Sequence, residues 1–312
     1  MRTILIWGLA ADPPLGSVRA VLSRIGAPAV FLDQQGVLGC KLELVVDGAV
    51  RGTLRILRKA IDLAAIGAVY VRPYDVRQIQ ALEGKRSGDP AFDRALAFED
   101  ALSCWLEMTP ELVVNRPSAM SSNNSKPYQI ELIRAAGFDV PHTVVTTDAS
   151  AVLEFWEKHG SVIYKSVSGV RSIVTRLRPE HRERLPDVSN CPTQFQEYVE
   201  GTDIRIHVVG EEVFGCEIRS DADDYRYPLL PDAGVQVRSY RVPSDLADRC
   251  RRLAAALELP VAGIDLRRTA AGRIYCFEAN PSPGFSFYEE ATGQQIGEAI
   301  ARLLVNAARA EP

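Results

Sequence analysis

Apolar and polar residues alternate in two segments near the C-terminal end of the chain, and this alternation predicts a β-hairpin. Residues 261–266 and 273–278 have the composition of strands, and the residues between them favour a turn. A tight turn places Asp265 opposite Glu278, and alternation puts Asn280 on the face of Glu278. These hard oxygen ligands suit Mg²⁺ when phosphate oxygens complete its octahedron. The alternative is a solvated hairpin whose acids are incidental.

The first hundred or so residues alternate between strand and helix patterns, which predicts a small α/β domain. Strand patterns cover residues 4–9, 29–32, 41–46, 50–56 and 68–72, and helix patterns cover 16–25 and 92–108. The turn after the first strand is neither a GxGxxG motif nor a Walker A loop, so we expect a plain connection there. A polar, turn-rich stretch at residues 115–125 marks the end of this domain.

Beyond residue 125 the pattern predicts further strands, with helices between some of them. Helix patterns cover residues 126–136, 149–158, 244–257 and 292–308, and strand patterns cover 143–146, 161–165, 172–177, 194–199, 204–209 and 213–219. Residues 178–191 are charged and contain proline, and we expect a loop excursion there.

Two of these strands, joined by residues 210–212, predict a second hairpin with one charged face. A three-residue loop places Asp203 opposite Arg219 and Arg205 opposite Glu217. Such a face commonly lies in water. It can also form the floor of a cleft in which arginines hold phosphate or carboxylate oxygens. The acids of the first hairpin favour the cleft.

Composition narrows the classes of function. The chain has 312 residues and a formal net charge of −4, which argues against broad nucleic-acid binding. No apolar run is long enough to span a membrane, and Met1 leads directly into a strand, so we expect no signal peptide. Six scattered cysteines fit a reduced, cytoplasmic setting. With four histidines and no HExxH motif, a zinc hydrolase is not expected.

The order of these segments resembles that of ATP-grasp ligases, and most of all the RimK-like carboxylate–amine ligases. The matching segments are Asn115-Arg116, Lys126, Ile163-Tyr-Lys165, Gln196-Glu-Tyr-Val199, Asp203-Ile-Arg205, Ala262-Gly-Ile-Asp265, Glu278-Ala-Asn-Pro-Ser-Pro-Gly-Phe285 and Tyr288-Glu-Glu-Ala-Thr-Gly293. The resemblance implies an α/β (α+β) chain with an ATP-grasp fold. It further implies an N-terminal Rossmann-like pre-ATP-grasp domain (1–114), a small subdomain (115–192) and a C-terminal subdomain with the metal site (193–312).

The same resemblance implies ATP and Mg²⁺ as cofactors, with Mn²⁺ as an alternative ion. The residues implied to bind the nucleotide are Lys126, Lys165, Ser168, Gly169, Glu197, Tyr198, Val199 and Asp203, with Glu200 as an alternative to Asp203 for the ribose. Those implied to act on the transferred phosphoryl group are Arg205 and Arg219, and the metal ligands are Asp265, Glu278 and Asn280. The loop after Lys165 has a single glycine, whereas the loop of the family is usually glycine-rich.

The reaction implied by the resemblance has two steps, acylphosphate formation and displacement of phosphate by an amine. His207 and Glu217 are the candidates to take the proton of the amine. The implied substrates are a carboxylate and an amine, and a peptide is one option. Self-association of the chain into a homo-oligomer is a further expectation. Residues 68–73 resemble part of the graspetide macrocyclases, which form side-chain esters or amides in ribosomal peptides. A regulator that binds nucleotide without catalysis is the third alternative, and the retained lysines and acids argue against it.

Overall fold

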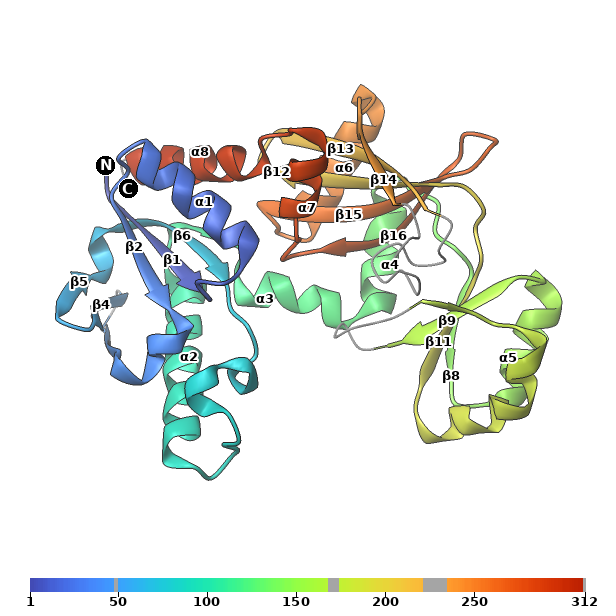
Figure 1. The fold of residues 1–312 in the computed structure, drawn as a ribbon, viewed down its shortest axis with the longest axis horizontal. Coiled ribbons are helices and arrows are strands. Elements are labelled where there is room, and N and C mark those ends of the chain that lie inside the picture. Colours follow the sequence, from blue (N-terminus) through green and yellow to red (C-terminus); the bar gives the residue numbers. More distant parts are fainter. Residues whose placement is uncertain (48–49, 168–173, 221–234, 311–312) are drawn as a thin grey trace.

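The computed structural model of the chain describes residues 1–47, 50–167, 174–220 and 235–310, and within these residues it forms four β-sheets. Figure 1 shows a parallel sheet at one end of the molecule and a small antiparallel sheet at the other end. A larger antiparallel sheet lies between and above them. The fourth sheet, whose short strands are antiparallel, packs beside the parallel sheet.

The parallel sheet belongs to the N-terminal part of the chain and is covered on both faces. Its order is β2 (Ala29–Asp33), β1 (Thr3–Gly8), β6 (Ile66–Arg72) and β7 (Leu112–Val114). Ile4 and Ile6 pack on α1 (Pro13–Arg24), whereas Leu5 and Trp7 face α2 (Pro90–Met108). Alternate residues of a strand point to opposite faces. A strand buried on both faces therefore has the continuous apolar run seen at residues 4–7.

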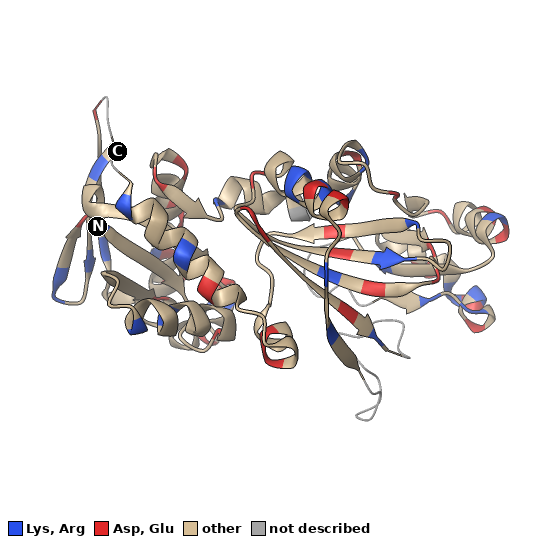
Figure 2. Cartoon of the chain, turned by 90° about the horizontal axis from the view of Figure 1, so that it is seen from above, with Lys and Arg blue, Asp and Glu red and all other residues tan. Residues whose placement is uncertain are grey.

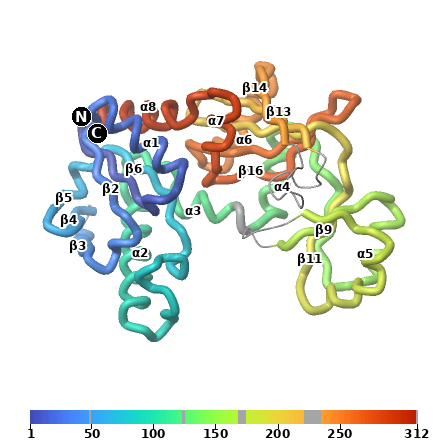
Figure 3. The backbone as a smooth tube through the Cα atoms, in the orientation of Figure 1, coloured from blue at the N-terminus to red at the C-terminus, as the bar shows by residue number. Residues whose placement is uncertain are grey.

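The chain leaves this sheet through α3 (Pro117–Met120) and returns to it with its last helix, as Figure 3 shows. We expected one helix over residues 292–308. The structure instead has α7 (Ser286–Thr292) and α8 (Ile296–Arg309), separated by Gly293 in the left-handed conformation at φ 71°. The apolar face of α8 packs into the core of the parallel sheet.

A buried arginine joins the same two parts of the chain. The Arg72 guanidinium at the end of β6 is paired with Asp12 at 2.6 Å and donates from Nη1 to the Pro283 carbonyl at 3.0 Å. The N-terminal and C-terminal parts therefore share an apolar core and a buried hydrogen bond.

The small antiparallel sheet has the order β10 (Thr175–Arg176), β9 (Val162–Ser166), β11 (Thr193–Glu197) and β8 (Thr143–Thr146). Its apolar face packs against α5 (Ala149–His159). Where we expected a loop at residues 178–191, the chain forms 3₁₀ turns from Pro179 to Asn190. These turns also cover the apolar face because Leu185 is buried there.

The larger antiparallel sheet carries the candidate site. Its order is β14 (Gln236–Tyr240), β13 (Glu212–Arg219), β12 (Thr202–Val209), β15 (Val261–Arg268) and β16 (Ile274–Asn280). Ile204, Ile206 and Val208 face α6 (Ser244–Ala256) and α4 (Lys126–Ala135). Asp203, Arg205 and His207 therefore point to the opposite face.

The predicted register of the second hairpin is wrong by one residue. Val209 pairs with Glu212, so the turn has two residues rather than three, and Gly210 adopts φ 54° in it. Arg205 consequently faces Cys216, and Asp203 faces Ile218. A shift of one residue moves every side chain of a strand to the other face, so Glu217 and Arg219 lie opposite to Arg205.

Charged residues follow one another along the strands of this sheet, with acids and bases interspersed (Figure 2). The described part of the chain contains no helix whose length and apolar character would let it cross a bilayer.

Candidate active site

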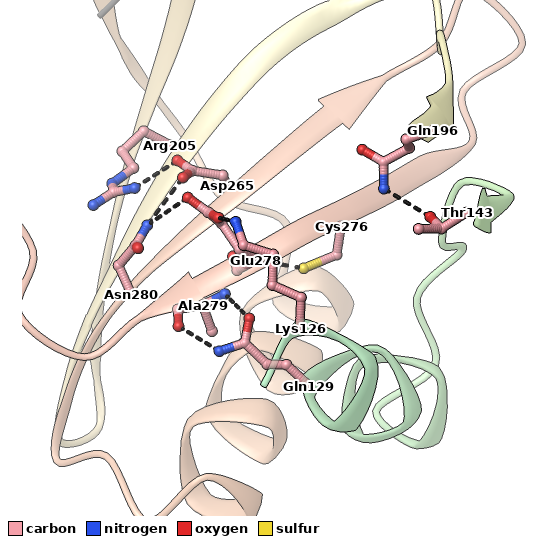
Figure 4. Close-up of polar contacts among 10 residues, drawn as sticks. All are labelled: Lys126, Gln129, Thr143, Gln196, Arg205, Asp265, Cys276, Glu278, Ala279 and Asn280. Atoms are coloured by element: carbon pink, nitrogen blue, oxygen red, sulfur yellow. Dashed lines mark hydrogen bonds and ion pairs between the residues drawn. The ribbon is translucent and has the colours of Figure 1, made fainter. Parts of the chain in front are cut away.

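The two acids of the first hairpin meet as predicted. Asp265 of β15 pairs with Glu278 of β16, and the register shifts only beyond this pair, towards the turn. The Asn280 amide nitrogen lies 3.0 Å from Asp265 Oδ2 and 3.3 Å from Glu278 Oε1 (Figure 4). All three polar groups therefore converge at the edge of the sheet.

Two buried cations face these acids. The Lys126 ammonium, at the start of α4, lies 3.3 Å from Glu278 Oε2, and Arg205 Nη1 lies 2.5 Å from Asp265 Oδ1. All four side chains are mostly shielded from water, with exposures between 6% and 19%. Ion pairs persist in such surroundings only when opposite charges and hydrogen bonds compensate for lost hydration. The cluster is thus a compact arrangement of opposite charges.

The chemistry of this cluster fits a magnesium ion. Asp265 and Glu278 supply carboxylate oxygens, and one amide group reaches both of them. The amide of Asn280 presents its nitrogen to the acids, and a half turn of the amide would present its oxygen instead. Rotation about the bond that precedes the amide exchanges its acceptor oxygen and its donor nitrogen, so the side chain can turn either atom towards the acids. Carboxylates together with an amide oxygen are ligands that Mg²⁺ accepts.

Arg205 is held by its neighbours on the same face. Its Nε donates to His207 Nε2 at 3.4 Å, and the His207 ring meets Tyr288 edge to face at 5.1 Å. Gly263 makes room for Arg205, because a Cβ at this residue would lie only 2.2 Å from the guanidinium. Full burial, and then the charge of Arg205, lower the pKa of His207 well below 6.5. His207 is therefore neutral and supports Arg205.

The neutral state of His207 predicts a dependence of stability on pH. Below about pH 6.5 the unfolded chain takes up a proton at His207 that the folded chain does not. The free energy of unfolding should therefore decrease as the pH is lowered, by at most about 1.4 kcal/mol per pH unit from this group. Thermal melts between about pH 7.5 and 5.5 should show a shallower loss for His207→Gln than for the unsubstituted protein. Parallel curves would contradict the burial of a neutral histidine.

Arg219 does not lie where the sequence analysis placed it. Its side chain is 64% exposed and pairs with Glu217 at 3.0 Å, and Glu217 also accepts from Arg268. Glu217, predicted to face Arg205, is therefore engaged on the other side of the sheet. The register of β12 and β13 explains why Arg219 and Glu217 differ from the prediction. Arg205 reaches the acids because it pairs with Asp265 of β15 on the other side of β12.

The polar face of the small sheet carries further buried groups. Lys165 lies opposite Gln194, and both are buried. Gln196, on the same face, donates to Thr143 at 3.0 Å (Figure 4). Within the described part of the chain, the side-chain oxygens of Gln194 and Gln196 are buried and accept no hydrogen bond.

The sequence motifs do not identify either glutamine as a ligand. Their alternation with buried Phe195 could have indicated that both face away from the apolar core. Ser168 and Gly169, predicted to contact phosphate, lie outside the described residues.

The end of β11, the start of β12 and the segment between them hold the remaining predicted residues. Glu197 lies 3.4 Å from His159, and the Tyr198 ring stacks 3.9 Å from the Arg176 guanidinium. The Val199 carbonyl accepts from Arg267 at 2.9 Å. Asp203, expected beside Arg219, is instead gripped by Arg267 through two bonds of 2.7 and 3.0 Å. Arg267 thus fixes the link at both ends.

Comparisons with known proteins give a consistent result. The family model described as "RimK-like ATP-grasp domain" matches residues 123–304. A probable alpha-L-glutamate ligase of Picosynechococcus sp. is 28% identical over 251 residues, which are 76% of this chain and 82% of that protein.

Solved structures extend the similarity to nearly the whole chain. The ATP-grasp ligase PsnB, complexed with a variant of its minimal precursor, Mg and ADP, has a TM-score of 0.81 and 26% identity over 98% of both chains. The macrocyclase MdnC of Microcystis aeruginosa MRC, bound with the precursor peptide MdnA, also has a TM-score of 0.81. Its 22% identity, over 97% of this chain and 99% of MdnC, supports similarity of fold alone.

Proposed function

The chain belongs to the RimK-like ATP-grasp family, and from that premise we propose that it is an ADP-forming ligase that joins a carboxylate to an amine. The expected ATP-grasp fold and family are confirmed. The observation that carries the proposal is the convergence of Asp265, Glu278 and Asn280 with Lys126 and Arg205 at one edge of a sheet. This set can hold a metal ion and oppose the charge of a triphosphate.

We propose that the nucleotide lies between the polar face of the small sheet and this edge. The buried oxygen of Gln196 is suited to accept a hydrogen bond from the amino group of adenine, because buried acceptors need donors. The edge of the base would also meet the backbone of the link at Glu197, Tyr198 and Val199. Asp203, or the exposed Glu200, would bind the ribose.

The phosphates would then extend towards the acids. Lys126 and Lys165 supply cations for the phosphate oxygens, and Arg205 supplies a guanidinium at the transferred group. Asp265, Glu278 and Asn280 would hold Mg²⁺, or Mn²⁺ in its place, and the ion would neutralise charge between neighbouring phosphates. A second arginine at this group, Arg219, stays a proposal. The exposure of its side chain and its ion pair with Glu217 argue against this role.

The reaction needs no nucleophile from the protein. A carboxylate oxygen of the substrate attacks the γ-phosphorus, the bond from that phosphorus to the β,γ-bridging oxygen breaks, and ADP leaves. The amine nitrogen then attacks the acyl carbon, the bond from this carbon to the phosphate oxygen breaks, and phosphate leaves as the amine gives up a proton. The protein contributes positioning and a fixed arrangement of opposing charge.

A peptide is the second candidate substrate, with esters or amides formed between its side chains. The observation that favours it is the similarity to PsnB, complexed with its precursor, over 98% of both chains, including the N-terminal domain. The match to the glutamate ligase covers a smaller part of this chain. The two candidates share the first step and differ in the nucleophile of the second.

Product analysis tests the proposed route. We expect ADP and inorganic phosphate in equal amounts when the protein is incubated with ATP, Mg²⁺ and a panel of carboxylates and amines. The reason is that transfer of the γ-phosphoryl group to a carboxylate leaves ADP. Chromatography of the nucleotides with a phosphate assay measures both products, and ATP without acceptor is the control. AMP and pyrophosphate would contradict the acylphosphate route.

A catalytically inactive regulator is the least favoured alternative, because the buried acids keep both of their cationic partners. A cytoplasmic location and self-association stay predictions. All six cysteines are free, and four of them are buried.

A further inference from the structure

The strand that carries Glu278 and Asn280 lies at the edge of its sheet. β16 is last in the order of strands, so among the described residues its outer backbone groups pair with no further strand of the sheet. Near the turn, Asp139 takes over part of this pairing, with bonds of 3.2 Å to the Ile274 carbonyl and 2.9 Å from the Cys276 amide. The end of the strand that bears the candidate ligands needs another partner, because buried backbone groups are almost always paired.

Gln129 of α4 is that partner. Its side-chain nitrogen donates to the Ala279 carbonyl at 2.8 Å, and its oxygen accepts from the Ala279 amide at 3.0 Å (Figure 4). One buried side chain thus makes both bonds that a neighbouring strand would make at this residue. Ala279 lies between Glu278 and Asn280, so the two hydrogen bonds from Gln129 hold the backbone that joins two candidate ligands.

The same helix supplies a second contact to this strand. Lys126, three residues before Gln129, lies 3.3 Å from Glu278. Residues three apart are neighbours on one face of a helix. This face of α4 therefore holds the backbone of β16 through Gln129 and the carboxylate of Glu278 through Lys126.

Asn115 holds the chain on the other side of Asn280. Its buried amide nitrogen donates to the Pro281 carbonyl and, at 2.7 Å, to the Val261 carbonyl. Its oxygen accepts from the Val261 amide at 3.2 Å. Val261 begins β15, the strand that carries Asp265. Asn115 thus ties the strand of one acid to the residue that follows Asn280.

We propose that Gln129 and Asn115 are positioning residues of the metal centre, which fix Glu278 and Asn280 by holding the backbone on both sides of Asn280. The inference rests on the proposed function, because it takes these side chains as the metal ligands. Mg²⁺ demands a near-ideal octahedron, so a small displacement of its ligands weakens binding. Groups that hold ligands in place typically change metal affinity or activity by about 10- to 100-fold.

The affinity for Mn²⁺ in the presence of ADP tests the positioning role of Gln129 and Asn115 without turnover. Electron paramagnetic resonance measures the free Mn²⁺. We expect Gln129→Met to weaken Mn²⁺ binding by about 10- to 100-fold. Asn115→Leu should change it in the same direction. The matched control is Gln34→Met, because buried Gln34 makes the same pair of bonds to the Tyr74 backbone, at 3.0 and 2.9 Å, in the N-terminal domain. Gln34→Met should lose thermal stability but keep the Mn²⁺ affinity of the unsubstituted protein.

Equal Mn²⁺ affinities in Gln129→Met and Gln34→Met would overturn the inference and leave the proposed ligase function standing. Absence of Mn²⁺ binding by the unsubstituted protein would overturn the metal site itself, and the inference with it.

If Gln129→Met does not fold, Gln129→Glu replaces it. The glutamate still accepts from the Ala279 amide and loses only the donor to the Ala279 carbonyl. An added negative charge should attract a cation, so weaker Mn²⁺ binding by Gln129→Glu would support positioning. Unchanged or tighter binding would overturn it.

Discussion

Asp265→Asn and Glu278→Gln are each expected to lower magnesium-dependent kcat by at least about a hundredfold. Each substitution keeps the volume of the side chain and one oxygen but removes a negative charge from the pair that faces Lys126 and Arg205. Groups that only support a metal ligand are worth about 10- to 100-fold, so loss of charge on a ligand itself should be at least as severe. Steady-state kinetics over a range of Mg²⁺ concentrations measure the effect.

The matched control for this pair is Glu212→Gln. Glu212 lies on the same sheet, but it is half exposed and pairs with Arg302 at the surface. Such a pair contributes about 1 kcal/mol or less to stability, and its loss should leave kcat unchanged. Circular dichroism should show that all three variants are folded. Near-native activity of both acid variants at limiting Mg²⁺ would mean that the hairpin is not the metal site.

Arg205→Lys is expected to lower kcat by about a hundredfold while the Kd for ATP changes little. Lysine keeps the positive charge but loses the planar fork that grips two oxygens at once. One lost contact to charge that develops in the transition state is worth roughly 3 kcal/mol, or about a hundredfold in rate. Only 6% of the Arg205 side chain is exposed, so water cannot replace the hydrogen bonds that lysine fails to make. Single-turnover rates and nucleotide titrations separate the two quantities.

Arg219→Lys is the comparison for Arg205→Lys. With 64% of its side chain exposed and Glu217 as its partner, Arg219 should tolerate lysine with little change in kcat. A larger loss in Arg219→Lys than in Arg205→Lys would reverse the order of importance and make Arg219 the arginine of the transferred group.

The first hairpin shows what the sequence could specify. The strand patterns on both sides of the turn predicted the two paired strands correctly, but the predicted tight turn is wrong, because Arg268 pairs with Ile274 and residues 269–273 join the strands. Asp265 faces Glu278 because a register shift between Asp265 and Leu266 compensates for the longer turn. Such a bulge adds one residue to one strand, and the alternation of apolar and polar residues did not predict it.

The second hairpin shows where the same reasoning fails. Loops of two and three residues fit the sequence Gly210-Glu211-Glu212 equally well, and the choice decides which side chains share a face. The structure takes the shorter loop. Arg205 kept its predicted face because the alternation of β12 itself is unambiguous, whereas the partners of Arg205 and Asp203 depended on the register.

The buried amides were beyond prediction for another reason. Gln129 and Gln196 are polar residues in patterns that give no sign of burial, and their partners lie far away in the sequence. Polar side chains are mostly exposed, so a glutamine is expected at the surface unless the fold brings a backbone or a ligand to it. Only the packing of α4 against β16 reveals the role of Gln129.

The packing of α8 on the parallel sheet limits which fragments of this enzyme can fold on their own. A fragment that begins after Val114 would keep the acids, but it would leave the apolar side of α8 without Ile4, Leu15 and Val18 to cover it. It would also release the Pro283 carbonyl from Arg72, only three residues after Asn280. The N-terminal part therefore supports the C-terminal part that carries the candidate site, and we expect recombination between relatives to succeed only when α8 and the parallel sheet are inherited together.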